Sequence, residues 1–406
     1  MWRKRIQRMV EKNQKELLGI LLRRYPAFIL GDSVDEAAGV PTFAFHDVTS
    51  AVLEPMLHFL SNNGYATLTA DEYVERQIRP ERRRQREVLL TFDDGLASLY
   101  TVVYPALKRF GLKAVAYIVP GRILVPGRIP RGTALSDSER LCPWDAIVEM
   151  HASGVLDFQS HSMYHHSIST STRVVDFMRP DVKFSFLESD LAPLPEIEGE
   201  FDDSEELAYG RPIYRWKSRF TDATAFQESR VVMSACMQHV KRSGGADYFK
   251  QRDWYPRLKK VLAEARSIPG ASGGRFETSD EQRSAILHDL LDSKREIEQR
   301  LPGKIVRHFC YPWYRGSRLA VQLSVQAGYI SNAWASLTPR FCRRALHVTH
   351  IARLPPPYLW RLPGNGQKSL SDVLRQRLAQ ICSRRALETG FLWAGLAHHT
   401  ILSICS

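Results

Sequence analysis

The stretch that decides the fold is Val88-Leu89-Leu90-Thr91-Phe92-Asp93-Asp94-Gly95, where an apolar run ends at two carboxylates and a glycine. The unbroken run before Asp93 predicts a buried strand, because β-branched and aromatic residues suit a sheet that is covered on both faces. Gly95 ends the strand and lets another group approach the backbone closely. Two carboxylates at the end of a buried strand are costly unless a partner neutralises them. A metal ion is the obvious partner, and candidate ligands follow later in the chain.

Strand-like and helix-like segments alternate on both sides of this stretch. Such alternation predicts parallel β/α units, and the ends of parallel strands converge on one face of a barrel. The predicted strands are residues 42–47, 66–69, 88–92, 113–119, 155–160, 328–334 and 347–354, and the predicted helices are residues 50–63, 96–110, 143–152 and 279–301.

Two histidines follow the predicted strand 155–160, in the segment His161-Ser162-Met163-Tyr164-His165. Their i, i+4 spacing puts both imidazoles on one face if the segment turns helically. With a carboxylate they make an Asp-His-His set, which suits Zn²⁺ or a similar divalent ion that keeps open positions. A histidine pair alone is more often structural, but the upstream Asp93-Asp94 favours metal ligation. His166 is an alternative to His165 as the second histidine ligand.

A third motif is Arg307-His308-Phe309-Cys310-Tyr311-Pro312. In this order, the three motifs resemble those of the polysaccharide deacetylases, the carbohydrate esterase group that carries the NodB homology domain. The resemblance implies an α/β fold, a distorted (β/α) barrel of about seven strands. The glycine that usually follows the third motif is displaced here to Gly316.

The resemblance also implies roles for individual residues. Asp93 would be the general base, and Asp94, His161 and His165 would hold the metal ion. Arg307 would pair with the base, which fixes the carboxylate and keeps it ionised. A backbone N–H at Tyr311 would help to hold the oxyanion.

The general acid has two candidates, because the family's fourth and fifth motifs match poorly. The aspartate of the fourth motif is absent from residues 328–334, and no leucine-rich strand ends in a clear catalytic histidine. His350 is one candidate and His46 is the other. We favour His46, because it ends the first predicted strand, whereas the chain after His350 continues as a strand.

The reaction that the resemblance implies is hydrolysis of an N-acetyl or N-formyl group on a sugar of a glycan or a lipid-linked glycan precursor. Water bound to a divalent ion, Zn²⁺ first and Co²⁺, Ni²⁺ or Mn²⁺ as alternatives, would attack with Asp93 as the base. This activity belongs to carbohydrate metabolism and polysaccharide biosynthesis. The alternative, which the poor fourth and fifth motifs support, is a catalytically inactive NodB-like protein that binds a glycan or a phosphate.

Composition describes an ordinary globular protein: 406 residues, 44% hydrophobic and 25% charged. The net charge of +12 favours an anionic partner, either a glycan or a membrane surface. No nucleic-acid motif accompanies the charge, so we expect no nucleic-acid partner. Six cysteines form no Cys-x-x-Cys pair, and the N-terminus lacks a signal peptide's apolar core. We therefore expect free thiols and a cytoplasmic protein, peripheral at the inner membrane face if the N-terminal helix binds lipid.

The predicted domains are a basic amphipathic N-terminal extension (1–39), a deacetylase-like barrel (40–355) and a C-terminal helical extension (356–406). Residues 1–24 would form a helix that lies on an anionic membrane or packs on the domain. The barrel carries an insertion at about 170–278, with an acidic run at Glu196–Glu206 and basic-aromatic clusters at Arg211–Lys217 and Arg252–Arg257. The insertion either covers the cleft and helps to choose the substrate, or presents solvated faces over a small core.

Overall fold

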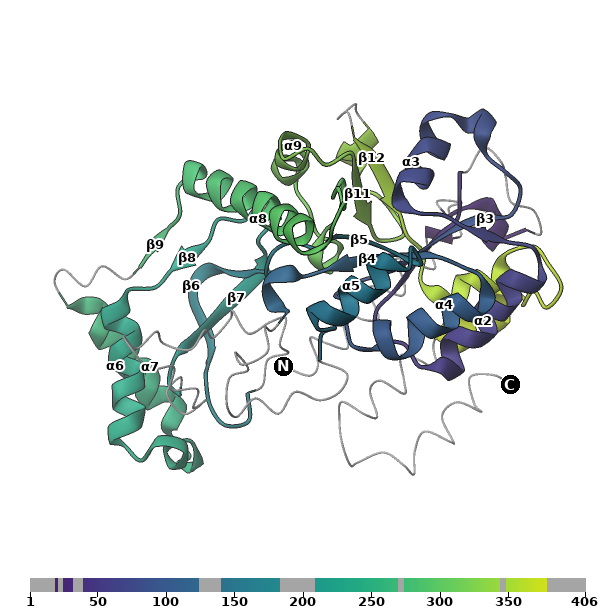
Figure 1. Cartoon of the computed structure of the whole chain (residues 1–406). Helices are drawn as coiled ribbons and strands as arrows, with labels where there is room; N and C mark the ends of the chain where they lie inside the picture. The colour runs from purple at the N-terminus through teal and green to yellow at the C-terminus, as the bar shows by residue number, and fades with distance from the viewer. Residues whose placement is uncertain are drawn as a thin grey trace, which may run out of the picture.

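The computed structural model describes residues 19–20, 25–31, 39–123, 140–182, 209–268, 274–343 and 348–377. Within them, parallel strands form one sheet (Figure 1). The strands in sheet order are β1 (Thr42–Phe45), β3 (Glu87–Phe92), β4 (Ala114–Ile118), β5 (Leu156–Ser160), β10 (His308–Cys310), β11 (Ser331–Trp334) and β12 (Thr349–Ala352), and β2 (Ala66–Thr67) pairs with β3.

The sheet closes on itself just after β12. Leu354 forms a parallel bridge with Phe43 of β1. The Ala44 N–H donates to the Leu354 carbonyl at 2.9 Å, and the Leu354 N–H donates to the Thr42 carbonyl at 2.7 Å. The predicted α/β barrel of about seven strands is therefore confirmed.

Helices cover the outside of the barrel, as expected for parallel β/α units (Figure 1). Two of them begin with capping boxes, Thr69 with Glu72 and Thr278 with Glu281, and these fix where each helix starts. The helices are α2 (Ser50–Asn62), α3 (Ala70–Ile78), α4 (Tyr104–Phe110), α5 (Trp144–Ala152), α8 (Ser279–Arg300) and α9 (Arg318–Gln326). The predicted helix 96–110 begins with a π-helical turn at Leu99–Val103, and α4 follows it.

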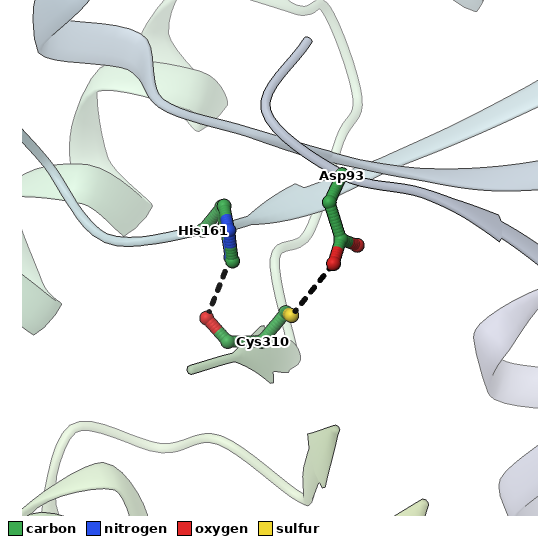
Figure 2. Close-up of side chains that lie close together, drawn as sticks. All are labelled: Asp93, His161 and Cys310. Atoms are coloured by element: carbon green, nitrogen blue, oxygen red, sulfur yellow. Dashed lines mark hydrogen bonds between the residues drawn. The ribbon is translucent and has the colours of Figure 1, made fainter. Parts of the chain in front are cut away.

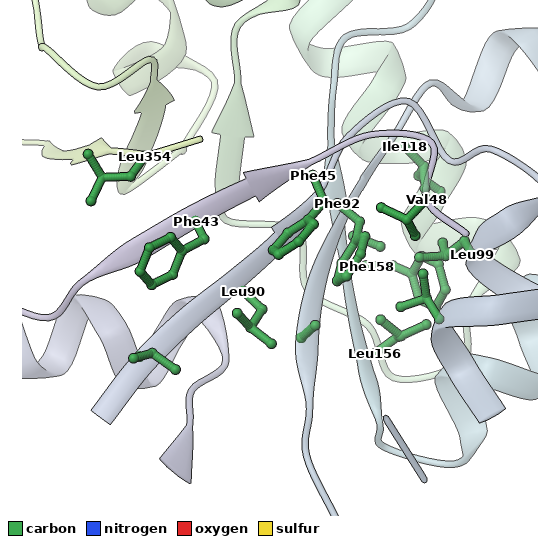
Figure 3. Close-up of a cluster of buried hydrophobic side chains, with 14 of the residues drawn as sticks. Phe43, Phe45, Val48, Leu90, Phe92, Leu99, Ile118, Leu156, Phe158 and Leu354 are labelled. Carbon is green, nitrogen blue, oxygen red and sulfur yellow. The ribbon is translucent and has the colours of Figure 1, made fainter. Parts of the chain in front are cut away.

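Side-chain alternation along β3 divides the core in two. Leu90 and Phe92 belong to the large cluster under the helices, together with Phe43, Phe45 and Phe158 (Figure 3). Leu89 belongs to the other cluster, inside the barrel, whose further members include Val115, Tyr117, Cys310, Ala333 and Ile351. Successive side chains of a strand point to opposite faces, so Leu89, Thr91 and Asp93 point to the same face. Asp93 therefore points into the barrel at the end of its strand.

The segment between β5 and α8 forms elements outside the parallel sheet. Strands β6 (Ser167–Phe177) and β7 (Pro212–Ser218) pair antiparallel, and so do β8 (Phe226–Gln227) and β9 (Arg275–Phe276). Helices α6 (Arg230–Arg242) and α7 (Trp254–Ser267) lie side by side at a distance from the barrel (Figure 1). This inserted module has its own buried cluster, which includes Phe177, Val232, Cys236, Tyr248, Leu258 and Leu262.

Several segments with sequence predictions lie outside the described residues. These are most of the N-terminal helix 1–24, the acidic run Glu196–Glu206, loop residues 124–139 and the C-terminal residues 378–406. Of the first, Gly19 and Ile20 are described and helical, and of the C-terminal extension residues 370–377 are helical. Among the described parts of the chain, no helix combines the length and apolar character needed to cross a membrane. The described cysteines, Cys142, Cys236, Cys310 and Cys342, are free thiols.

Candidate metal centre and active site

The two carboxylates at the end of β3 point in different directions, because the chain turns sharply between them. Asp94 has φ +72° and Gly95 has φ +75°, so two consecutive residues are left-handed. A Cβ on Gly95 would lie 3.0 Å from Cγ2 of Ile118, which explains why a glycine stands there. The turn leaves Asp93 inside the barrel and carries Asp94 toward the histidine segment.

The histidine segment is a tight turn, not a helix. Ser162 and His165 have φ +72° and +57°, and the His165 N–H donates to Oγ of Ser162 at 2.8 Å. The helical turn considered for the i, i+4 pair is therefore wrong. The turn still brings the rings of His161 and His165 to a centroid distance of 5.1 Å.

Asp94, His161 and His165 form a buried set of convergent ligand atoms. Oδ1 of Asp94 lies 3.3 Å from Nε2 of His161 and 3.8 Å from Nε2 of His165. One ligand atom from each residue lies within 4.8 Å of the others, as a shared cation requires. Nδ1 of His161 is hydrogen-bonded to the Cys310 carbonyl at 2.9 Å (Figure 2). This bond orients the ring so that Nε2 faces Asp94. Two imidazole nitrogens and a carboxylate oxygen fit a divalent ion with open positions.

The alternative ligand His166 is not part of this set. Its ring lies against Tyr164, at a centroid distance of 5.0 Å, and that tyrosine is exposed. The geometry therefore favours His165 over His166.

Burial and mutual contact shift the pKa values of this cluster. Burial raises the pKa of Asp94, but its hydrogen bond with His161 and the nearby imidazoles outweigh burial and hold the pKa below its usual range. Burial lowers the pKa of His165 to about 3, and the charge of His161 adds to that effect. Burial also lowers the pKa of His161, but Cys310 and Asp94 outweigh it and raise the pKa well above normal. Asp94 is thus ionised and His165 neutral, the forms in which they bind a metal, whereas His161 keeps a proton that a bound cation would displace.

The arginine that holds Asp93 is Arg353, not Arg307. Nη1 of Arg353 donates to Oδ1 of Asp93 at 2.6 Å, and Nη2 donates to Oδ2 at 2.8 Å. Arg307 instead pairs with Asp71 at 2.8 Å and is about half exposed. The predicted pairing of Arg307 with Asp93 is therefore wrong. Burial raises the pKa of Asp93, but the Arg353 charge outweighs burial and leaves the pKa below normal, so the carboxylate is ionised and able to accept a proton.

Asp93, His161 and Cys310 form a second set of close ligand atoms (Figure 2). Sγ of Cys310 lies 3.6 Å from Oδ2 of Asp93, but Nη2 of Arg353 also lies 2.9 Å from that sulfur. A metal ion here would sit against a guanidinium, and burial raises the pKa of the Cys310 thiol. Of the two sets, Asp94, His161 and His165 therefore form the better candidate for a metal site.

Of the two candidate acids, the structure brings His46 to the site and leaves His350 outside it. Nε2 of His46 lies 3.9 Å from Oδ2 of Asp93, and its side chain is 41% exposed, so it stands at the mouth of the barrel. His350 accepts a hydrogen bond at Nδ1 from the Trp334 indole, at 3.0 Å. Strand alternation puts His350 on the face opposite Ile351 and Arg353, which point into the barrel.

The N–H of Tyr311 is engaged in the sheet. It donates to the Ala333 carbonyl at 3.4 Å, and the buried ring packs on Trp334 at a centroid distance of 4.4 Å. This hydrogen bond contradicts the expected oxyanion role of the Tyr311 N–H. Gly316 allows this packing, because a Cβ there would lie 2.8 Å from Trp334 and 2.9 Å from Tyr311.

Two aromatic residues that sequence reasoning missed flank the site. Trp313 and Tyr314 are both left-handed, with φ +51° and +57°, a conformation that costs bulky residues about 1–2 kcal/mol each. The ring of Trp313 lies 4.0 Å from that of His165, and the Tyr314 hydroxyl lies 3.3 Å from Nε2 of His46. The only sequence signal was the displaced glycine after the third motif, which indicated an altered turn.

The parallel barrel gathers an ionised carboxylate, a candidate metal-ligand triad and an exposed histidine at one rim, which places the protein among α/β barrels with a candidate metal site. Residues 81–179 match the family model described as polysaccharide deacetylase, and this match covers the Asp93-Asp94 and His161–His165 motifs. Over these residues the chain is similar to the polysaccharide deacetylase family.

Similar proteins carry related names. The poly-beta-1,6-N-acetyl-D-glucosamine N-deacetylase of Escherichia coli strain K12 is 30% identical over 134 residues, 32% of this chain and 20% of that protein. The protein named polysaccharide deacetylase YxkH of Bacillus subtilis strain 168 is 30% identical over 93 residues, 21% of this chain and 33% of that protein. The matched region thus spans about a fifth of the Escherichia coli protein and about a third of the Bacillus subtilis protein. A solved de-N-acetylase from Aggregatibacter actinomycetemcomitans is 16% identical, with TM-score 0.48 over 78% of this chain and 93% of that chain.

Proposed function

We propose that this chain is a metal-dependent hydrolase that removes an N-acetyl or N-formyl group from a sugar of a glycan or a lipid-linked glycan precursor. The observation that carries the proposal is the buried Asp94–His161–His165 triad beside Asp93, whose carboxylate Arg353 holds in two hydrogen bonds. An ionised base next to a divalent-cation site is the arrangement that amide hydrolysis by water requires. The metal is Zn²⁺ or a similar divalent ion, since nitrogen and carboxylate ligands suit several of them.

Each described side chain then has a step in the reaction. When bound at Asp94, His161 and His165, a divalent ion lowers the pKa of water and polarises a carbonyl. Asp93 accepts the proton of the attacking water, and Arg353 holds the carboxylate in place while it does so. His46, exposed at the rim, donates a proton to the departing nitrogen as the C–N bond breaks. The products are the carboxylic acid and the free amino sugar.

The substrate class follows from charge and from the relatives. The net charge of +12 supports an anionic or lipid-linked glycan, which would lie near a membrane surface. The name of the Escherichia coli relative supports a β-1,6-linked N-acetylglucosamine oligomer as the first substrate to assay. We place the reaction in the cytoplasm, as expected from the sequence.

The test is release of acetate from an N-acetylglucosamine tetramer, with and without a chelator. We expect chelation to abolish release and added Zn²⁺ to restore it. Asp93→Asn should lose activity but retain metal, whereas Asp94→Asn should lose both, because only Asp94 is a ligand. Asp292→Asn, on the exposed face of α8, is the matched control. Activity that survives chelation, or tight binding of the tetramer without any acetate release, would count against the enzyme and favour a binding protein.

A further inference from the structure

Trp216 is an exposed tryptophan that the core of the inserted module does not explain. It lies on β7, opposite Ser169 of β6, and its side chain is 38% exposed. It is absent from the module's buried cluster, whose members come from β6, β7, α6, α7 and the residues around them. A single exposed apolar residue is ordinary, but an exposed tryptophan that packs with a second aromatic residue beside a candidate site forms a larger apolar surface for a ligand.

Contacts with the barrel lead from Trp216 directly to the candidate metal centre. The ring of Trp216 lies 5.5 Å from that of Trp313, and the ring of Trp313 lies 4.0 Å from that of His165, a metal ligand. Trp313 holds this position in a left-handed conformation, with φ +51°. A strained residue at the rim of a site is a reason to look for a ligand there.

The inserted module holds Trp216 firmly at this place. Phe220, two residues after the end of β7, is buried in the barrel core. Its ring lies against those of Phe309 and Tyr311, at centroid distances of 5.2 and 5.9 Å. The N–H of Ser317, in the loop after Trp313, donates to the Phe220 carbonyl at 2.8 Å. Arg219 bonds both oxygens of the buried Glu277 at 2.7 Å. Trp216 is thus part of a rigid wall, as a binding subsite requires.

We propose that Trp216 and Trp313 form an aromatic subsite that stacks on a sugar ring next to the one that carries the reacting acyl group. The inference rests on the proposed function and narrows its substrate: the enzyme takes a chain of at least two sugars in preference to a monosaccharide. The flat apolar faces of pyranose rings pack well on aromatic rings, and the subsite begins beside the metal ligand His165. The chain's own inserted strand therefore supplies the preference for an oligomer.

The experiment compares Trp216→Ala with Trp216→Phe and Phe276→Ala in the full chain. Phe276 is another exposed aromatic residue of the inserted module, 45% exposed, on β9, where it packs on Phe226. For the N-acetylglucosamine tetramer, we expect KM to rise about tenfold in Trp216→Ala with kcat within about twofold, because uniform binding is lost. Trp216→Phe should recover most of the KM, and Phe276→Ala should match wild type. The wild-type preference for the tetramer over the monosaccharide should fall by the same factor in Trp216→Ala.

The outcomes separate this inference from the proposed function. If wild type releases acetate and Trp216→Ala keeps the wild-type KM for the tetramer, the subsite is wrong and the enzyme stands. If wild type releases no acetate, calorimetric titration with the tetramer still tests the subsite, since Trp216→Ala should then weaken binding about tenfold. Equal affinity of wild type and Trp216→Ala for the tetramer in that titration would overturn the inference.

Discussion

The rim of the barrel and the inserted module both lie at the candidate site, but they differ in which side chains they bury and which they expose. At the rim, charged side chains are buried and held by one another: Asp93 and Arg353 are both almost fully buried and share two hydrogen bonds. In the module, a small apolar core supports an exposed aromatic side chain, Trp216. The barrel thus buries and orients the candidate reacting groups, whereas the module presents a surface that a ligand can cover.

If this division holds, changes in the two regions should act on different kinetic constants. Buried charges at the rim orient the base, so their loss should lower kcat. Contacts of the module position Trp216, so their loss should raise KM for an oligomer. The following variants test the division.

Arg353→Met should have the largest effect. Its loss leaves the Asp93 carboxylate buried without its cation, so the pKa of Asp93 rises and the base becomes protonated. We expect kcat to fall about 100-fold or more, and the free energy of unfolding to fall by about 3–5 kcal/mol. Acetate release and urea denaturation measure the two effects.

Arg219→Met is the matched control, because the Arg219 side chain is only 13% exposed and is also paired, in this case with the buried Glu277 in the module. It should lower stability and raise KM for the tetramer while kcat stays within about threefold of wild type. A kcat that collapses equally in both variants would contradict the division between barrel and module.

Part of the fold and of the candidate site could be predicted from the sequence. The parallel β/α units follow from the alternation of strand-like and helix-like segments, whereas the barrel and the convergence of Asp94, His161 and His165 follow from the resemblance that the motifs carry. Each of these depends on residues close together in sequence, or on a rule about which strand ends meet.

Arg353 escaped prediction for a physical reason. It directly follows β12, far along the chain from Asp93, and it reaches the base only because β12 and the residues after it close the barrel. Arg307 matched a motif, yet the structure turns it toward Asp71. Trp216 was noticed in a basic-aromatic cluster, but its contact with Trp313 depends on how the module docks. Long-range packing, not local pattern, decides such contacts.

Phe220→Ala should have the next largest effect. The ring is fully buried between the module and the barrel, against Phe309 and Tyr311. Its removal leaves a cavity that costs about 3 kcal/mol of unfolding free energy and loosens the wall that carries Trp216. We expect KM for the tetramer to rise more than kcat falls. Phe59→Ala, in the barrel core away from the module, should cost similar stability without that rise.

Asp289 lies where the barrel and the module join. Its substitution has the smallest expected effect and tests a single carboxyl group. It belongs to α8, and its Oδ1 accepts a hydrogen bond from the Met163 N–H, in the histidine segment, at 2.8 Å. Its Oδ2 is buried and has no hydrogen-bond partner among the described residues. Burial raises the pKa of this carboxyl to about 6 from an ordinary 3.8, although the charge of His166 and the Met163 N–H oppose the rise.

The sign of the pH effect follows from that shift. Between the unfolded and folded pKa values the folded state keeps the proton that the unfolded chain releases, so stability falls as pH rises. Asp289→Asn removes the titrating group and keeps an oxygen for the Met163 N–H. Between pH 5 and pH 7, in chelator, the unfolding free energy of wild type should fall by about 1 kcal/mol more than that of Asp289→Asn. Asp292→Asn should follow wild type, and parallel pH profiles for wild type and Asp289→Asn would show that the buried carboxyl does not hold its proton at this junction.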